Sequence, residues 1–215
     1  VQSLVGSEMC IRDSLEGEKD YIGTIQLGLR TSSDDLSGEV LEQQSWPSLS
    51  QAELDGQLQH FRGLIQQRPP AVSAVHVDGE RAHTRARRGE QLLLASRPVT
   101  IEQLELLRWD PSTGQLEIKL RCSAGTYVRS LARDLGDQLG CGGALAVLRR
   151  TAALGFTLEA SLPLEALGPD TSLSDPLQAL EHLPKQQLSQ EQWLAWTRGQ
   201  RLPLERLDPV SYTHL

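Results

Sequence analysis

Alternating apolar and polar positions define the first regular element that the chain predicts. Residues 20–29 (DYIGTIQLGL) alternate in this way and are rich in residues that favour strands, and the polar turn TSSDDLSG leads to residues 39–43. A period of two is typical of a strand that buries one face. We therefore expect residues 20–29 and 39–43 to pair as an antiparallel hairpin.

The same pattern predicts further strands. Residues 99–109 and 115–122 should form a second hairpin, joined by the turn DPSTG, because Leu116, Ile118 and Leu120 share one face. Two shorter strands are expected at residues 72–77 and 152–158.

A helical period marks two longer segments. Residues 50–63 begin with the capping-box pair Ser50 and Glu53 and then repeat apolar residues at helical spacing. A second helix should open at Thr126 and end at Gly140, since an apolar stripe runs between them. Three shorter helices are expected at residues 144–148 and after Ser174 and Ser189, the last of them ending at Gly199.

Strand pairs with short connections, interleaved with helices, predict an α+β fold with a mostly antiparallel mixed sheet flanked by helices. The pattern does not favour a βαβ nucleotide-binding fold. Residues 1–18 and 208–215 lack a usable period, so we expect them to be non-native or disordered, the alternative being ordinary frayed termini.

Composition narrows the possible partners and compartments. No run approaches the roughly 18 apolar residues of a membrane helix, so we expect no membrane partner and a cytoplasmic chain, with an organelle as the alternative. The three cysteines are an odd number without CxxC spacing, and the histidines have no zinc spacing. We therefore expect neither a disulfide framework nor a metal site.

Charge argues against a protein that coats nucleic acid, because the formal net charge is −7. The arginines are nevertheless clustered, with Arg81, Arg85, Arg87 and Arg88 falling within eight residues. Such a cluster is typical either of a local RNA-binding surface or of a solvated helix face, and the sequence leaves both open.

One strand-to-helix junction carries candidate chemistry. In RCSAGTYVRSLARDLGDQLGC a strand passes directly into a helix, which places Tyr127 and Arg129 in the first turn. An arginine there can orient a carboxylate with two hydrogen bonds, and a tyrosine can stack on a ring. The alternative is a core tyrosine and a surface arginine.

Four segments, in order, resemble motifs of the tRNA pseudouridine synthase B family. The junction is similar to CSxGTYxRxLxxDLGxxLG, KDYIGTIQLGLRTSSDDLSG to KxYxxxxxLGxxTxTxDxxG, FRGLIQQRPPAVSAVHVDGERA to FxGxIxQxPPxxSAxKxxGxRx, and GCGGALAVLRR to GCxAxLxxLRR. The resemblance covers residues 19–167 and implies the pseudouridine synthase fold in that region. Residues 168–207 would then begin a small C-terminal RNA-binding domain.

The resemblance implies an isomerase, acting without a metal or other cofactor, that converts uridine 55 of the tRNA T-loop to pseudouridine. The base is detached, turned and rejoined through C5, which needs an aspartate nucleophile and a dry pocket. Tyr21 falls on the family tyrosine that stacks on the base and is a candidate for proton transfer, and Arg129 on the arginine that pairs with the aspartate. Tyr127 and Leu148 fall on residues that line the pocket. The arginines at 81, 85, 87 and 88 lie in the RNA-gripping insertion.

The chain departs from the family pattern in two ways. His76 stands in place of the usual lysine, and His83 in place of a tyrosine. More importantly, the family's nucleophilic aspartate belongs to an upstream GxLDPxAxG motif that these 215 residues do not contain. We therefore expect a monomer that binds the tRNA T-loop but is inactive alone, or else a non-catalytic RNA-binding piece. Tyr21, Tyr127 and Arg129 are expected to converge on one cleft.

Overall fold

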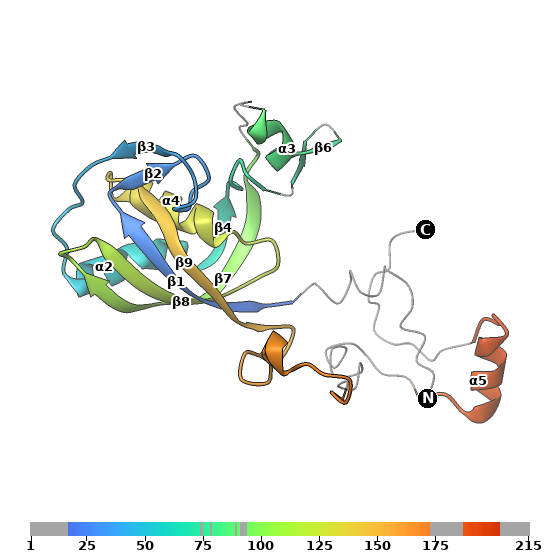
Figure 1. Cartoon of the computed structure of the whole chain (residues 1–215). Helices are drawn as coiled ribbons and strands as arrows, with labels where there is room; N and C mark the ends of the chain where they lie inside the picture. Colours follow the sequence, from blue (N-terminus) through green and yellow to red (C-terminus); the bar gives the residue numbers. More distant parts are fainter. Residues whose placement is uncertain are drawn as a thin grey trace. The chain divides into compact units, whose positions relative to one another are not determined.

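Six strands of the chain form one antiparallel sheet in the order β10-β9-β1-β8-β7-β4 (Figure 1). Their bounds are β1 (Lys19–Leu27), β4 (Gly63–Gln67), β7 (Arg97–Asp110), β8 (Gln115–Cys122), β9 (Gly143–Ala153) and β10 (Phe156–Thr157). The computed structural model describes residues 17–73, 75–77, 79–88, 90, 94–172 and 187–202. It divides the chain into two compact units, residues 1–167 and 168–215, and the sheet belongs to the first.

Two helices, α2 (Gln51–Leu58) and α4 (Val128–Gln138), cover one face of this sheet. Their buried leucines pack with the alternating strand residues into one cluster, which includes Leu54, Leu58, Leu131, Leu135, Ile25, Leu116, Ile118 and Leu120. Burial of this shared apolar face is the main force that holds sheet and helices together. The predicted α+β class and the hairpin of β7 with β8 are confirmed.

Local signals explain where these helices begin and how closely they pack. Ser50 and Glu53 form the predicted capping box of α2, and Gly140 follows α4 with φ 71°, in the left-handed region. A Cβ atom on Gly136 of α4 would overlap the backbone of Gly142 and Gly143. Small residues at this crossing therefore let α4 lie directly on the start of β9.

The first predicted hairpin is wrong in its pairing. β1 pairs with β8 and β9, while residues 40–43 (β3, Val40–Gln43) pair with a separate short strand, β2 (Leu29–Thr31). Gly28 separates β1 from β2 with φ 82°, and its N–H donates to Gly142 O at 3.0 Å. The glycine turns the chain out of the sheet, so the alternating run does not continue as one strand.

Three other expectations also need correction. The helix expected at residues 50–63 ends at Leu58, because a 3-10 turn (η1, Gln59–Phe61) leads into β4, which the sequence did not predict. Residues 144–148 are not a helix but part of β9, whose pairing with β1 supplies their hydrogen bonds. Among the described residues of the expected strand 72–77, regular structure is limited to β5 (His76–Val77), which pairs with β6 (Glu80–Arg81).

The arginine-rich segment after β6 forms a short helix, α3 (Ala82–Arg87), which the sequence did not predict. Ala82 is fully buried, and its N–H donates to Val75 O at 2.7 Å. The segment is therefore folded, with β5 and β6, into a small element beside the main sheet (Figure 1).

The second unit contains helix α5 (Gln190–Thr197). Ser189 and Gln192 form its predicted capping box, and Gly199 follows it with φ 75°. Trp193 and Trp196 pack with ring centroids 5.9 Å apart. The helix start expected after Ser174 lies outside the described residues, and an RNA-binding role for this unit stays a prediction.

Candidate active site

Arg129, in the first turn of α4, is held by three acceptors from two loops. Its guanidinium donates to Ser33 O and to Asp35 Oδ2, both at 3.2 Å, and to Val72 O at 2.9 Å. Two of these acceptors are backbone carbonyls, so the arginine fixes the loop after β2 and the loop after β4 at once. Its side chain is only 24% exposed, which strengthens these contacts relative to a fully hydrated pair.

Asp35 is the carboxylate partner of Arg129 and is itself held in place. Burial works to raise its pKa, but hydrogen bonds from Ser37 and Ser33, together with the charge of Arg129, hold the pKa below the ordinary value. Ser33 Oγ donates to Asp35 Oδ1 at 2.7 Å, and Ser37 N–H to the same oxygen at 3.0 Å. The carboxylate is therefore ionised at neutral pH, and it orients the arginine.

A surface pocket of about 340 Å³ opens beside this pair. It is lined by the ion pair and by apolar residues of the same loop and of β9, namely Asp35, Leu36, Ser37, Arg129, Leu145, Ala146, Val147 and Leu148. The structure thus brings two of the predicted site residues, Arg129 and Leu148, to one pocket. A guanidinium beside an apolar wall suits a flat, polar-edged ring and a developing negative charge.

Tyr21 lies on the sheet face that α4 covers, and only 8% of it is exposed. It pairs in register with Arg150, and two residues further along β1 Gly23 pairs with Leu148. Arg150 Nε donates to Tyr21 Oη at 3.3 Å. Tyr21 therefore shares a face with the pocket residue Leu148, although it is not among the residues that line the pocket.

Tyr127 is the residue before α4, and its backbone is fixed by a buried glutamine. Its N–H donates to Gln67 Oε1 at 2.8 Å, and Gln67 Nε2 donates to Tyr127 O at 3.1 Å. Arg97 lies over the tyrosine ring, 5.1 Å from its centroid. Tyr127 does not line the pocket either, so convergence of all three predicted residues on one cleft stays a prediction.

Sequence reasoning missed a buried ionic cluster one turn further along α4. Arg133 donates to Asp34 Oδ2 at 2.8 Å, to Asp134 Oδ1 and to Arg68 O at 2.8 Å. Ser130 Oγ also donates to Arg68 O at 2.8 Å. Polar side chains of α4 therefore bind both the loop that contains Asp35 and the loop that contains Val72. The same two loops supply the acceptors of Arg129.

The predicted RNA-contacting arginines around α3 lie in a different electrostatic setting. Arg85 Nε donates to Glu90 Oε2 at 2.7 Å, and Arg88 Nη2 to Glu80 Oε2 at 2.7 Å. Arg81 is exposed, whereas the side chain of Arg87 lies outside the described residues. Much of the positive charge that the sequence suggested is thus offset within the segment.

The part of the chain that the structure describes gives little support for a metal site, a reactive cysteine or a membrane-spanning helix. There, no group of three or more histidine, cysteine, aspartate or glutamate side chains is arranged to hold a metal ion. Burial raises the pKa of both the Cys122 and the Cys141 thiols, which keeps them protonated and unreactive. No helix in the described ranges has the length and apolarity to cross a membrane.

Comparisons with known proteins agree on one relationship. Residues 7–128 match the family model described as "TruB family pseudouridylate synthase (N terminal domain)". The chain is 62% identical over 194 residues to tRNA pseudouridine synthase B of Parasynechococcus marenigrum (strain WH8102), covering 89% of this chain and 66% of the relative. It is 54% identical over 207 residues to the protein of the same name from Synechococcus sp. (strain WH7803), covering 92% and 69%.

The chain spans about two thirds of the length of these curated relatives. Among solved structures, it is similar to one chain of the crystal structure of a Cbf5–Nop10–Gar1 complex. That similarity has a TM-score of 0.49 and 22% identity, and it covers 70% of this chain and 34% of the other.

Proposed function

We propose that this chain, which belongs to the TruB family of pseudouridylate synthases, supplies the base pocket and RNA-binding surface of a synthase acting on uridine 55 of the tRNA T-loop. The observation that carries the proposal is the pocket in which Arg129 and Leu148 meet, with Asp35 orienting the guanidinium. The relatives named tRNA pseudouridine synthase B support tRNA as the substrate.

The proposed roles follow from the chemistry of each side chain. The C1′–N1 bond of the uridine breaks, the uracil turns, and a C1′–C5 bond forms. C5 then loses its proton and N1 carries one in the product, so the overall reaction is an isomerisation. Leu148 excludes water from the turning base, and Arg129 stabilises a carboxylate nucleophile and the charge that develops on the ring. Tyr21 and Tyr127 offer aromatic faces for stacking, and Tyr21 carries a phenol for proton transfer.

The nucleophile itself is not among these 215 residues, since no GxLDP motif occurs in them. Asp35 is no substitute, because Arg129 and two serines already hold its oxygens. We therefore infer that the chain as given does not form pseudouridine alone. The absence of the motif also favours a second candidate function, that of a non-catalytic RNA-binding piece.

A complementation experiment separates the two functions. The segment of the Parasynechococcus relative that precedes the matched region would be added in trans, and pseudouridine measured in a T-loop stem-loop RNA. We expect product only from the mixture, and none when the chain carries Arg129→Gln. Turnover by the chain alone would contradict the inferred role of the missing aspartate. RNA binding without turnover by the mixture would favour the non-catalytic function.

A further inference from the structure

Two arginines that were not predicted as site residues each lie over a tyrosine of the candidate active site. The guanidinium carbon of Arg97 is 5.1 Å from the ring centroid of Tyr127, and that of Arg150 is 5.4 Å from the ring centroid of Tyr21. Arg97 begins β7, opposite Gln67 of β4, and Arg150 lies on β9 directly opposite Tyr21. The two tyrosines that the family resemblance singled out therefore both have a cation on one ring face.

These two arginines also differ from most others in the first unit, because their charge is not offset. Arg30, Arg62, Arg85, Arg88, Arg121, Arg129 and Arg133 all form ion pairs with carboxylates. Within the described ranges, neither Arg97 nor Arg150 has a carboxylate partner. Arg97 Nη2 donates to Gly125 O at 2.5 Å and Arg150 Nε to Tyr21 Oη at 3.3 Å, so each guanidinium keeps further N–H groups for a ligand.

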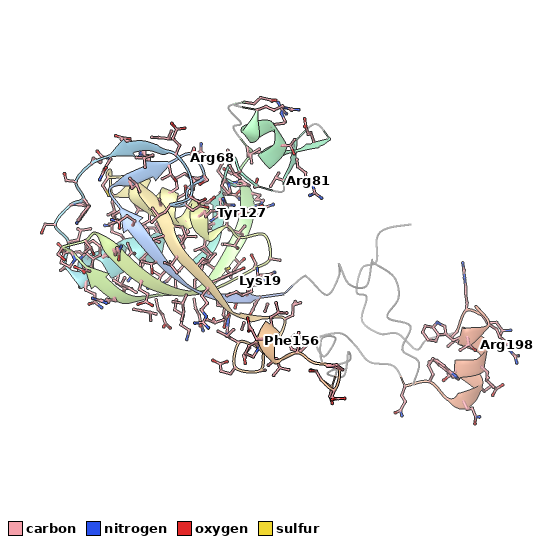
Figure 2. All side chains as sticks on the ribbon, in the orientation of Figure 1. Lys19, Arg68, Arg81, Tyr127, Phe156 and Arg198 are labelled. Atoms are coloured by element: carbon pink, nitrogen blue, oxygen red, sulfur yellow. The ribbon has the colours of Figure 1, made fainter. Side chains whose placement is uncertain are left out.

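Both arginine–tyrosine pairs lie near the turn between β8 and α4, residues 123–127. Cys122 of β8 lies beside β1, where its register partner is Lys19. The charges of Lys19 and Arg150 both reach the Cys122 thiol, where they oppose the effect of burial on its pKa. At the other end of the turn, Arg97 is bonded to Gly125 and lies over Tyr127 (Lys19 and Tyr127 are labelled in Figure 2).

We propose that Arg97 and Arg150 bind the RNA backbone phosphates on either side of the nucleotide whose base enters the pocket. The proposal rests on the proposed function, since it takes the pocket to be a base site. A nucleotide that leaves its stack brings both flanking phosphates toward the protein surface. A guanidinium that already lies on an aromatic face, with free N–H groups, can bind such a phosphate through two bonds while the ring contacts the base.

The negative net charge of the chain makes Arg97 and Arg150 more important for RNA binding than they would be in a basic protein. At a net charge of −7, general attraction for a polyanion is weak, so binding depends on the few cations that no carboxylate offsets. Arg97 is half-buried and Arg150 is exposed, and each is fixed by a backbone or phenol acceptor before RNA arrives. Little ordering is then required when the phosphate binds.

The test measures binding of the 215-residue chain to a T-loop stem-loop RNA by fluorescence anisotropy, between 50 and 200 mM KCl. Arg97→Gln and Arg150→Gln should each weaken binding roughly 3- to 10-fold at low salt and reduce the log–log salt slope by about 1. Arg97→Lys and Arg150→Lys keep the charge and should retain most of the slope. The charge-matched control is Arg108→Gln, because Arg108 pairs with Glu117 in register, between the buried Leu116 and Ile118, and so lies on the opposite sheet face.

A neutral methylphosphonate in place of a phosphate beside the target uridine provides a second readout. It should reduce the salt slope of the parent chain even without any substitution in the protein, but it should not reduce the slope of the double variant Arg97→Gln with Arg150→Gln. The proposal is overturned if the double variant keeps the parent slope, or if Arg108→Gln loses as much. A parent chain that binds no T-loop RNA would instead overturn the proposed function.

Discussion

The chain has two arginine-rich regions, around α3 and in the first turns of α4, whose arginines have different partners. Near α3, Arg85 and Arg88 reach Glu90 and Glu80, which lie in the same short segment. In α4, Arg129 and Arg133 reach aspartates and backbone carbonyls of two distant loops. A cluster of arginines in sequence therefore does not identify the region where arginines organise the site.

Solvent exposure explains why the two sets of ion pairs contribute differently to the free energy of folding. The side chain of Arg88 is 53% exposed, whereas that of Arg133 is 11% exposed and that of Asp34 is 16%. Water and salt screen the exposed pair, so it contributes little. A buried cation that loses its partner, or a buried aspartate that loses its cation, leaves an uncompensated charge in a poorly hydrated place.

Arg133→Ala should therefore give the largest effect of the changes considered. We expect a loss of about 3–5 kcal/mol in the free energy of unfolding, because the partly buried Asp34 and Asp134 lose the cation that is bonded to them and Arg68 O loses a donor. Urea denaturation followed by circular dichroism measures the change. Arg88→Ala is the matched control and should leave the urea midpoint within error. Equal shifts for the two variants would contradict the contrast drawn from burial.

Replacing Glu80 and Glu90 together with glutamine should have the next largest effect, on RNA binding. The change removes both carboxylate partners of Arg88 and the Glu90 contact of Arg85, and it raises the formal net charge from −7 by two, to −5. We expect tighter binding to the T-loop stem-loop and a log–log salt slope steeper by about 1, since the charge of Arg88 becomes available for a phosphate.

The control for that experiment is Glu39→Gln with Glu165→Gln, which makes the same charge change at two exposed acids away from α3. If both pairs of substitutions tighten binding equally, the effect reflects net charge alone. The carboxylates near α3 would then not regulate this segment.

Sequence predicted those parts of the fold that local signals determine. The pair Ser50 and Glu53 fixed the start of α2, and the alternation of Leu116, Ile118 and Leu120 fixed β8. It failed where long-range pairing decides, as in residues 144–148, which favour a helix by composition but become β9 by pairing with β1. The helical spacing that ends at residue 63 likewise did not predict β4, whose sheet partner, β7, is distant in sequence.

The site was predictable only through its motif. Arg129 and Leu148 were found because their segments resemble the family, and the structure brings both to one pocket. The contact of Arg133 with Asp34 joins residues 99 apart in sequence, and the contact of Arg150 with Tyr21 joins residues 129 apart. Nothing in local spacing indicates such pairs, and they are visible only in the folded structure.

Lowering the pH should stabilise the fold through Asp34, which pairs with α4, and destabilise it through Glu90, which pairs with α3. Burial raises the pKa of Asp34 above its ordinary 3.8, despite the opposing charge of Arg133. Because the folded state binds this proton more tightly than the unfolded state, Asp34 contributes stability at pH values below 3.8. That contribution is lost as the pH rises through the raised pKa. The Arg85 hydrogen bond lowers the pKa of Glu90, so its contribution is present above the ordinary value of 4.5 and is lost as pH falls through the lowered pKa.

The measurement is the urea midpoint at several pH values between 3 and 7. Relative to Asp34→Asn, the parent chain should gain stability as pH falls, whereas relative to Glu90→Gln it should lose stability by a smaller amount, because Glu90 is exposed to solvent screening. Parallel pH profiles for the parent chain and Asp34→Asn would show that the carboxyl of Asp34 does not titrate differently in the folded state.

The smallest effect is expected when both members of the exposed pair are replaced, in Glu80→Gln with Arg88→Gln. The net charge stays at −7, and an ion pair is exchanged for two neutral side chains, while Glu90, which also pairs with Arg88, keeps its contact with Arg85. Affinity for the T-loop stem-loop and its salt slope should then match those of the parent chain within error, because a phosphate gains nothing from an arginine that a carboxylate occupies. A slope reduced by about 1 would mean that Arg88 leaves Glu80 to contact a phosphate directly. In that case the region around α3 contacts RNA directly, and its ion pairs break when RNA binds.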